Sequence, residues 1–348
     1  MADFSRPYTC YWRVVRVDPG TWEPTEEIPD VSGLSIQRDA TSSVPMLESG
    51  SMTVRVPADS SFGEGYCRVQ LLVEQDGDYS RHDVATFLAI PGNSKVDYGS
   101  RNVSVSLCSV LKPADEVVMI AGSYVFKGAD GADWVATQLR KCLSAPVHVE
   151  GSFSVDSYHV FSGGTTYLEA VWEVLDAASW CLRIDGHGEV TVMAKPSVPT
   201  VSLDRYGAKG VRPTWDDENS VAGVPNRYYA TDWTGERVEV VNEIQNSRTS
   251  VQARGRYIDY WDDSPTLING ESLIGYARRR LKEESTIVRT FKYTRAYDPD
   301  TTVFDMVNVN YPQLGLVGEA RVMGQELVVG NGIELRETSG LSEEEYDY

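Results

Sequence analysis

Short apolar stretches separated by polar and glycine-rich turns fill the first 112 residues of the chain. Within the last of these stretches, every second residue from Val103 to Leu107 is apolar and the residues between them are serines, which indicates a strand with one solvated face. A succession of short strands favours an antiparallel barrel or sandwich. The predicted strands are Tyr11–Val17, Gly33–Gln37, Ser51–Val56, Arg68–Glu74, Val84–Ile90 and Val103–Val110.

Helical spacing of apolar residues begins after this segment. Ala132–Leu143 carries apolar side chains three or four positions apart, which predicts a helix that ends before Pro146. Thr166–Ser179 has the same spacing and predicts a second helix. The buried stripe of that helix is expected to contain Leu168, Val171, Trp172, Leu175 and Ala178.

The stretch Ser157–Met193 combines several local signals in one block. Its pattern predicts a strand, a Gly-Gly turn, a helix and then a hairpin with the tip Asp185–Gly188. Thr166 as N-cap and Glu169 three positions later form a capping box, in which each side chain satisfies a free amide of the first turn. No metal-ligand spacing, nucleophile motif or phosphate loop lies in the block. It predicts a small folded unit that serves assembly and carries no chemistry of its own.

The pattern returns to strands from about Val201. A turn at Asp232–Glu236 and an Asn-Gly turn at Gly330–Gly332 each join two of them. One helix, Glu271–Glu284, interrupts the series and carries the basic run Arg278–Arg280. The predicted strands are Tyr228–Ala230, Arg237–Glu243, Thr286–Tyr293, Met306–Val309, Ala320–Val329 and Ile333–Arg336.

These elements predict an α+β, mainly β, protein in which two antiparallel β-barrel-like domains flank a small α+β domain. The N-terminal barrel domain is expected at residues 1–112 and the α+β middle domain at 113–198. The second barrel domain, with one helix, is expected at 199–336, followed by an acidic C-terminal tail at 337–348. The two outer domains share no sequence repeat.

Charge and cysteine content restrict the partners and the compartment. The 348 residues include 32 Lys and Arg against 51 Asp and Glu, a net charge of −19, which disfavours binding of a phosphate backbone or an anionic membrane. Five widely spaced cysteines suit small buried apolar residues in a reducing cytoplasm better than a disulfide framework. The chain shows neither a secretory signal nor a run of 18 apolar residues, so we expect a soluble protein made in a cytoplasm.

Candidate metal and catalytic residues are few. His148 and His159 have no cysteine at ligand spacing, and neither an HExxH nor a CxxC motif occurs. His187, at the hairpin tip, is expected to be a solvated turn residue. Three acidic clusters occur, at Asp216–Glu218, Asp262–Asp263 and Asp298–Asp300. They lack the spacing of a calcium-binding loop, and their carboxylates could act in a glycosidase only if folding brought two of them together. Solvated turns are therefore the simpler interpretation.

The remaining motifs are weak. Gly330–Gly332 lacks the third glycine and the helix of a dinucleotide site. Arg278–Arg280 could be an anion patch, but on a helix with neighbouring glutamates a solvated or subunit-contacting face is favoured. Trp215, Trp233 and Trp261 are core residues or, if exposed, sugar-stacking or interface residues. The sequence therefore predicts no catalytic, cofactor-binding or metal-binding residue, and no enzyme.

The order of elements resembles a known family. The resemblance rests on four stretches: the small residues that lead into the strand of Leu47–Val54, Tyr158–Phe161 before the capped helix, Val224–Asn226 before a strand, and Asp305–Val309. Over about residues 8–336 the chain resembles the tail hub proteins of bacteriophages and phage-like particles, in contractile and in long flexible tails. It departs from the family at Phe304, where a glycine usually precedes the aspartate.

The resemblance implies a structural role in a virion. It implies a homotrimer whose two barrel domains per subunit form a pseudo-sixfold ring, closing the distal end of the tail tube with a lumen for DNA. The implied partners are a distal tail or tail tube protein, the tape measure protein and a tail fibre or spike protein, with DNA only in transit. The chain would be made in the bacterial host cytoplasm and reside at the tail tip. It would need no cofactor and bind no membrane by itself.

Three other functions stay open at this point. The chain could be a distal tail ring protein, which would be a hexamer. It could be a tail-associated cell-wall hydrolase whose carboxylates meet only in the fold. It could also be a carbohydrate-binding tip module, which would need exposed tryptophan and tyrosine side chains.

Overall fold

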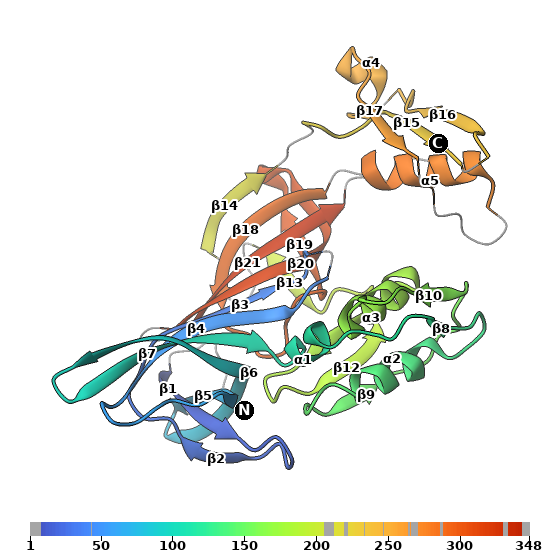
Figure 1. Cartoon of the computed structure of the whole chain (residues 1–348). Coiled ribbons are helices and arrows are strands. Elements are labelled where there is room, and N and C mark those ends of the chain that lie inside the picture. The colour runs from blue at the N-terminus through green and yellow to red at the C-terminus, as the bar shows by residue number, and fades with distance from the viewer. Residues whose placement is uncertain are drawn as a thin grey trace. The chain divides into compact units, whose positions relative to one another are not determined.

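The structure is a computed structural model, and it confirms a mainly β protein of the α+β class (Figure 1). Contacts divide the chain into two compact units. The first consists of Met1–Trp215 and Lys292–Ser339, and the second of Asp216–Phe291 and Gly340–Tyr348. The residues described are 8–42, 44–204, 212–218, 222–232, 234–245, 247–263, 265, 271–285, 288–329 and 333–342.

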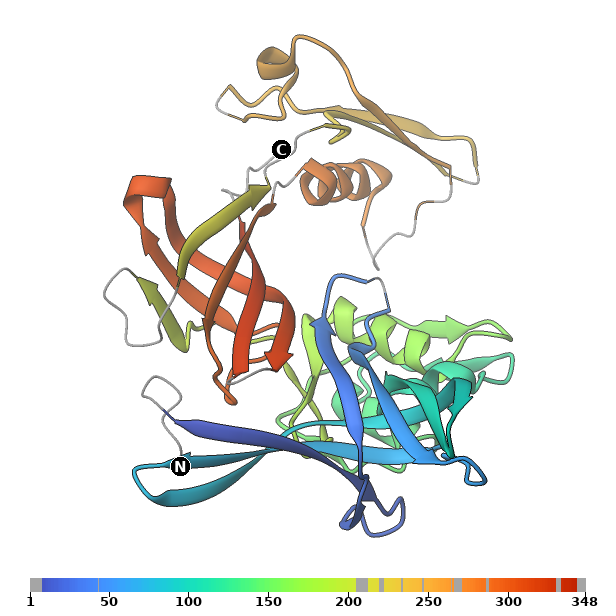
Figure 2. The same cartoon turned by 90° about the vertical axis from the view of Figure 1, so that its left-hand side faces the viewer.

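The N-terminal strands of the first unit form an antiparallel series in the order β3-β4-β7-β6-β5-β1-β2 (Figure 2). All six strands predicted in this segment are present. The additional strand β2 was missed because its four residues are all exposed and show no apolar alternation. The bounds are β1 Thr9–Val17, β2 Pro24–Glu27, β3 Val31–Asp39, β4 Leu47–Pro57, β5 Gly65–Gln75, β6 Asp78–Asp97 and β7 Ser100–Ser109.

The C-terminal strands join the same 13-stranded sheet, which we call the large sheet. Strand β20 pairs antiparallel with β3, from Gly324 opposite Asp39 to Leu327 opposite Ile36, so the sheet runs on through β21, β18 and β14. Strand β19 pairs with β20 and β13. The bounds are β13 Val201–Asp204, β14 Arg212–Glu218, β18 Val288–Ala296, β19 Met306–Tyr311, the 3₁₀ turn η1 Pro312–Leu314, β20 Leu316–Val329 and β21 Ile333–Ser342.

The expected separation into two barrel-like sheets needs correction. The described strands of both ends of the chain follow one path with β14 and β2 at its ends, so they do not close into barrels. Pairing between β3 and β20 depends on segments almost 290 residues apart, which no local pattern reveals. Strand β21 continues to Ser342, past the boundary set at 336, whereas the turn predicted at Gly330–Gly332 lies outside the described residues. The three-domain division itself stays a prediction.

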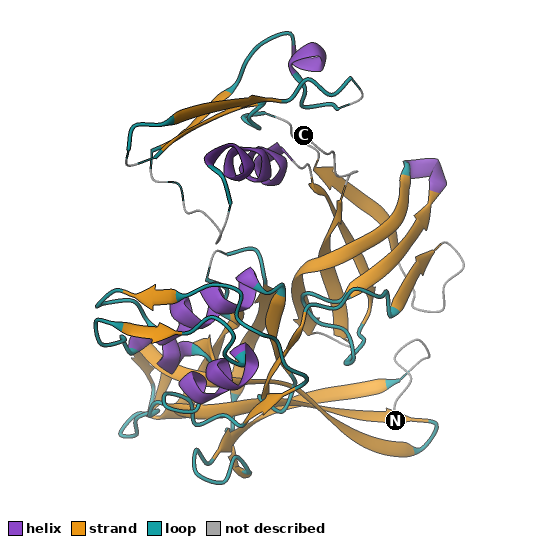
Figure 3. Ribbon diagram, turned by 90° about the vertical axis from the view of Figure 1, so that its right-hand side faces the viewer, coloured by secondary structure: helices purple, strands orange, loops and turns teal. Residues whose placement is uncertain are grey.

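The part of the chain from α1 to β12, residues 112–194, which we call the mixed segment, packs its helices against two small sheets, β11-β12-β9 and β10-β8 (Figure 3). Both predicted helices are present, and the capping box is formed: Thr166 Oγ1 accepts from the Glu169 amide at 3.1 Å, and Glu169 Oε2 accepts from the Thr166 amide at 2.7 Å. Helix α1 has only five residues and a proline in its first turn, so its apolar spacing gives no helical signal in the sequence. The bounds are α1 Lys112–Glu116, β8 Ser123–Val125, α2 Gly131–Leu139, β9 Val147–Val149, β10 His159–Phe161, α3 Tyr167–Ala177, β11 Trp180–Ile184 and β12 Val190–Ala194.

The second unit is a three-stranded sheet, β16-β15-β17, with a helix on one face. The predicted hairpin is confirmed, since the Asp232 amide donates to the Glu236 carbonyl at 3.0 Å. Tyr228, Tyr276 and Leu281 belong to the core between sheet and helix. The bounds are β15 Arg227–Thr231, β16 Arg237–Val241, α4 Val251–Arg254, β17 Asp259–Asp262 and α5 Leu273–Ser285.

Candidate functional site

The hairpin tip at Asp185–Gly188 is docked on the N-terminal sheet. The indole Nε1 of Trp22 and the Nη2 of Arg68 both donate to the main-chain oxygen of His187, each at 2.9 Å. The hydroxyl of Thr86 donates to the Gly186 oxygen at 3.1 Å. The expectation of a solvated turn residue at His187 is met only in part: its side chain is 35% exposed, whereas its main-chain oxygen accepts two hydrogen bonds within the joint. Local turn chemistry predicted the hairpin correctly but carries no information about what its tip contacts.

Buried charge and close approach shape this joint. The side chain of Arg68 is 1% exposed, donates to Thr86 Oγ1 at 3.0 Å, and lies 3.6 Å from the carboxylate of Asp83. Asp83 also lies 3.1 Å from Nδ1 of His187. A Cβ on Gly186 would lie 1.8 Å from the main-chain oxygen of Asp83, so only glycine fits there. The glycine at the tip is thus a packing requirement as well as a turn residue.

Two further contacts hold the mixed segment against the rest of the first unit. Trp172 of α3 donates its indole N–H to the main-chain oxygen of Pro45 at 3.0 Å. Arg183 of β11 donates to Asp305 at 3.1 Å and to the main-chain oxygen of Asp300 at 2.8 Å. Burial raises the pKa of Asp305 above its ordinary value. The segment is therefore anchored to both the N-terminal and the C-terminal part of the large sheet.

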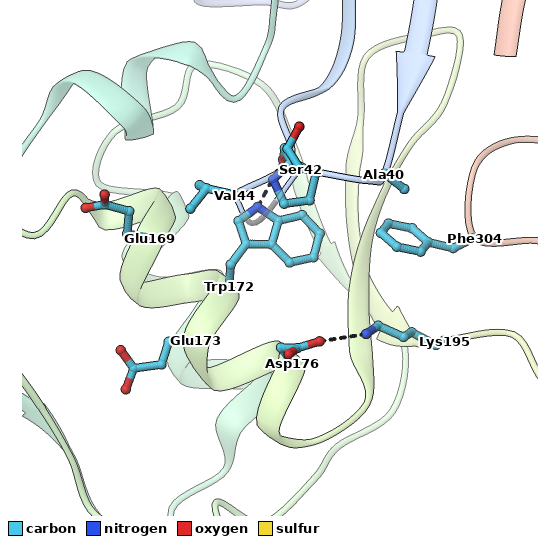
Figure 4. A pocket seen from close by; sticks show the side chains of 10 residues that line it. Ala40, Ser42, Val44, Glu169, Trp172, Glu173, Asp176, Lys195 and Phe304 are labelled. Atoms are coloured by element: carbon cyan, nitrogen blue, oxygen red, sulfur yellow. Dashed lines mark hydrogen bonds and ion pairs between the residues drawn. The ribbon is translucent and has the colours of Figure 1, made fainter. Parts of the chain in front are cut away.

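A pocket of about 330 Å³ lies beside Trp172 (Figure 4). Its aromatic wall is formed by Trp172 and Phe304, whose ring centres are 6.1 Å apart. At its rim, Lys195 pairs with Asp176 at 2.8 Å. Phe304 has φ +73°, the left-handed conformation that glycine favours, which fits a position where the resembling family usually has glycine. The lining residues are Ala40, Ser42, Val44, Pro45, Glu169, Trp172, Glu173, Asp176, Lys195 and Phe304.

The polar groups of this pocket are already engaged. Glu169 belongs to the capping box, and the carboxylate of Glu173 lies 2.8 Å from Nδ1 of His159. The same imidazole lies 3.2 Å through its Nε2 from the Oγ of Ser157, so a serine hydroxyl, a histidine and the carboxylate of Glu173 follow one another in the order of an activated hydroxyl nucleophile. The pocket therefore combines an apolar wall with a carboxylate that orients this histidine.

Metal-ligand clusters are absent from the part of the chain that the structure describes. His148 has a single carboxylate partner, Glu189, at 3.0 Å, and lies on a different sheet from His159. Among the described residues, no helix is both long and apolar enough to span a bilayer. The five cysteines are all free, and burial raises the pKa of Cys67 to about 12 and that of Cys181 to about 11.

The three acidic clusters differ in burial and in their partners. Asp298 is buried and lies 3.4 Å from Nη1 of Arg295, so the solvated-turn interpretation was wrong for this residue. The hydroxyls of Tyr228 and Tyr276 donate to Asp262 at 3.0 and 2.6 Å. The side chains of Asp216–Glu218 lie outside the described part of the structure.

Two arginines of the basic run on α5, Arg279 and Arg280, pair with nearby glutamates. Arg279 binds Glu271 at 3.0 Å and Glu283 at 3.2 Å, and Arg280 binds Glu283 and Glu284 at 2.7 and 2.8 Å. Such pairs balance the charge of Arg279 and Arg280, which favours a solvated helix face over an anion site there.

The open face of the second unit carries aromatic and arginine side chains. Trp261 is half exposed, and its ring lies 5.4 Å from that of Tyr229. The guanidinium of Arg237 lies over both rings, 4.4 Å from the Trp261 centre and 4.8 Å from the Tyr229 centre. Because this cation occupies the ring faces, sugar stacking is disfavoured there. Trp233 and the side chain of Trp215 lie outside the described residues.

Comparison with known proteins finds matches at the level of structure. No family model matches the chain, and no curated protein matches it. It is similar to a tail protein from Neisseria meningitidis MC58, with a TM-score of 0.63 and 12% identity over 97% of each chain. It is also similar to the 43 kDa tail protein of prophage MuSo2 from Shewanella oneidensis, with a TM-score of 0.59 and 12% identity over 95% of this chain and 98% of that one.

A third solved structure extends the comparison. The Francisella PdpA-VgrG complex matches with a TM-score of 0.56 and 8% identity, over 99% of this chain but only 60% of that one. At these identities the likeness concerns the fold. The chain has the fold of phage and prophage tail proteins, which confirms at that level its resemblance to tail hub proteins.

Proposed function

We propose that this protein is a structural component of a phage or phage-like tail tip, a hub that closes the distal end of the tail tube. The observation that carries the proposal is the match to the Neisseria tail protein, which covers 97% of both chains. The similarity of fold therefore extends over nearly the whole length of both chains. A fold alone does not define a function, so this similarity supports the tail-tip role by analogy.

The proposed assembly is a homotrimer in the virion tail. Its partners would be a distal tail or tail tube protein, the tape measure protein, and a tail fibre or spike protein. The charge of −19 suits a lumen through which DNA slides, since an acidic wall repels phosphate and releases no counterions. A potential map of the assembled ring with a neutral or basic bore would contradict this use of the charge.

We assign no catalytic role to the chain. The ion pair of Arg295 with Glu337 lies within the sheet: both side chains are fully buried, and Arg295 Nη2 donates to Glu337 at 2.8 Å. Gln325 donates to the same carboxylate at 2.7 Å. Charges used in this way order the sheet and have no access to a substrate.

Native mass measurement of the purified full chain tests the proposal. A trimer of the 38.6 kDa chain would have a mass of about 116 kDa (3 × 38.6). A hexamer would favour the distal tail ring, and a monomer at micromolar concentration would contradict the trimeric hub. Clearing of peptidoglycan by the purified chain would support the hydrolase alternative, and binding on a glycan array the carbohydrate-binding alternative.

A second test addresses the particle. Deletion of the gene should yield particles without completed tails, and expression of the chain in trans should restore them. Antibody labelling should then decorate the tail tip. Complete infectious particles without the chain would contradict a structural role at the tip.

A further inference from the structure

The connection between β16 and β17 carries a basic loop on a strongly acidic protein. Residues 247–258 include three arginines and no aspartate or glutamate, whereas the whole chain has a net charge of −19. These residues contain α4 and belong to the second unit, where α4 lies beyond one end of β17 (Figure 1). We call them the arginine loop. Its three arginines are Arg248, Arg254 and Arg256.

A buried asparagine fixes the first half of the arginine loop. Asn242 is fully buried and donates through Nδ2 to the hydroxyl oxygens of Ser247 and Thr249, both at 3.0 Å. Its main-chain oxygen accepts from the amide of Val251 at 3.0 Å. Burying polar side chains costs free energy unless they are hydrogen-bonded, and here their hydrogen bonds hold the loop backbone in place.

A second buried asparagine fixes the other half. Nδ2 of Asn226 donates to the main-chain oxygen of Arg256 at 3.0 Å, and its Oδ1 accepts from the amide of Ile258 at 2.7 Å. Ser250 caps α4, since its Oγ accepts from the amide of Ala253 at 3.2 Å. The backbone that carries the arginines is therefore ordered before any partner binds, and a partner does not bear the cost of ordering it.

The arginine side chains are accessible. Arg248 and Arg256 are exposed, and Arg254 is half-buried and donates to the main-chain oxygen of Val224 at 3.4 Å. Neither Arg254 nor Arg256 forms an ion pair with another residue that the structure describes. At these two positions the guanidinium groups keep donors that a ligand can use.

Two carboxylates flank the arginine loop along the chain. Asp259 is bound by both sides of the Arg227 guanidinium, at 2.7 and 2.8 Å, so its charge is already balanced. Glu243 is exposed on the other side. Even with Glu243 counted, three arginines leave the loop with a net charge of +2 (3 − 1). Guanidinium groups recognise planar or tetrahedral anions, so the fitting ligand carries carboxylates or phosphates.

The C-terminal residues of the same chain carry such carboxylates. Residues 343–348 have the sequence Glu-Glu-Glu-Tyr-Asp-Tyr and follow directly after the end of β21 at Ser342. Contacts group Gly340–Tyr348 with the second unit, which also carries the arginine loop. A ligand that belongs to the same chain is present at an effective concentration on the order of millimolar, which a free anionic peptide would not reach.

We propose that the arginine loop binds the acidic residues 343–348 of its own chain. One exposed ion pair adds little stability, but three arginines on an ordered loop opposite four carboxylates form a network. The contact attaches the end of β21 to the second unit through charge, and it weakens as salt screens the charges. Because it forms within one chain, it does not depend on the proposed tail-tip function.

Photocrosslinking in the purified full chain tests this contact. Gln252→p-benzoylphenylalanine places the probe on an exposed position of α4, and Thr234→p-benzoylphenylalanine, at the exposed turn between β15 and β16, is the matched control on the same unit. From position 252 we expect a crosslink to residues 343–348 at least fivefold more abundant than from position 234. Mixing copies with natural and heavy nitrogen separates crosslinks within a chain from those between chains. Crosslinks only between chains, or none to residues 343–348, would overturn the proposal.

A pair of single-charge variants tests the role of the arginines. Arg256→Gln should lower the crosslink from position 252 at least threefold, whereas Arg278→Gln, which removes the same charge from an exposed position of α5, should leave it unchanged. Thermal unfolding of both variants should match the wild type, since Arg256 is exposed and forms no ion pair with a described residue. Equal crosslink yields for the two variants would overturn the proposal.

A variant of the acidic residues separates their carboxylates from phosphate as the ligand. In the full chain, Glu343→Gln with Glu344→Gln and Glu345→Gln should free the arginine loop. At low salt, a labelled peptide with the sequence of residues 343–348 should then bind this variant at least tenfold more tightly than the wild type, as measured by fluorescence anisotropy. Binding of a short DNA duplex by the variant without binding of the peptide would assign the loop to phosphate and overturn the proposal.

Discussion

The guanidinium of Arg68 donates a 2.9 Å hydrogen bond to the main-chain oxygen of His187, 119 positions further along the chain. This bond joins a strand of the large sheet to the tip of a hairpin in the mixed segment. Because Arg68 is buried, the hairpin tip shields it from water and supplies an acceptor in return. The joint therefore couples the stability of two parts of the chain that local sequence patterns describe separately.

Arg68→Met should weaken this joint. The variant removes the donor to Thr86, Trp22 and His187 and leaves their oxygens without that partner, so we expect a loss of about 3 kcal/mol in the free energy of unfolding. Urea unfolding measures it. Arg81→Met, on an exposed position of the neighbouring strand, is the control and should cost less than about 0.5 kcal/mol. Equal losses for the two variants would show that the joint adds nothing to stability.

Gly186→Ala should separate the hairpin from the sheet. The added Cβ would meet the Asp83 oxygen at 1.8 Å, and backbone cannot move away as a flexible side chain would. We expect faster amide hydrogen exchange at Ile184–Val190 and around Thr86, with the rest of the large sheet unchanged. Gly63→Ala, where a Cβ meets nothing within 4 Å, is the control. Native-like exchange in the Gly186 variant would disprove the close docking.

Thr166→Ala should remove one half of the capping box. The Glu169 amide loses its acceptor at the start of α3, so we expect a loss of about 1 kcal/mol in unfolding free energy. Thermal or urea unfolding measures this change. Thr165→Ala, one residue before the cap, should be close to neutral, and a larger effect there than at Thr166 would contradict the role of the cap.

The buried thiol of Cys67 should make stability fall in alkali. Its pKa is raised by burial from 9.0 to about 12, so the thiol ionises first in the unfolded chain. The stabilisation is complete below about pH 9 and is lost as the pH rises towards 12, with about 1.4 kcal/mol lost at pH 10. Urea unfolding of the wild type and of Cys67→Ala from pH 8 to pH 10 should show this difference in slope. Parallel slopes would mean that the thiol ionises equally in both states.

Local patterns were sufficient where a structural element depends on its own residues. Alternating apolar positions predicted the strand around Val103–Leu107, and the spacing of Thr166 and Glu169 predicted a helix start that the two hydrogen bonds confirm. The same kind of reasoning missed β2, whose residues are all exposed, and gave no contact for the main chain of His187. Strand β2 is held by its pairing with β1, and His187 by hydrogen bonds from Trp22 and Arg68, so both depend on residues outside their own segments.

The sequence by itself determined the mainly β class, the position of the capped helix, and a composition unsuited to binding nucleic acid. Only the tertiary structure decided that β3 and β20 share one sheet, that the hairpin tip docks against Arg68, and that Tyr124, Phe126 and Tyr158 meet on one exposed face. The physical reason is the range of the interactions. Strand alternation and helix caps act between residues a few positions apart, whereas sheet pairing and docking join residues whose separation along the chain carries no signal.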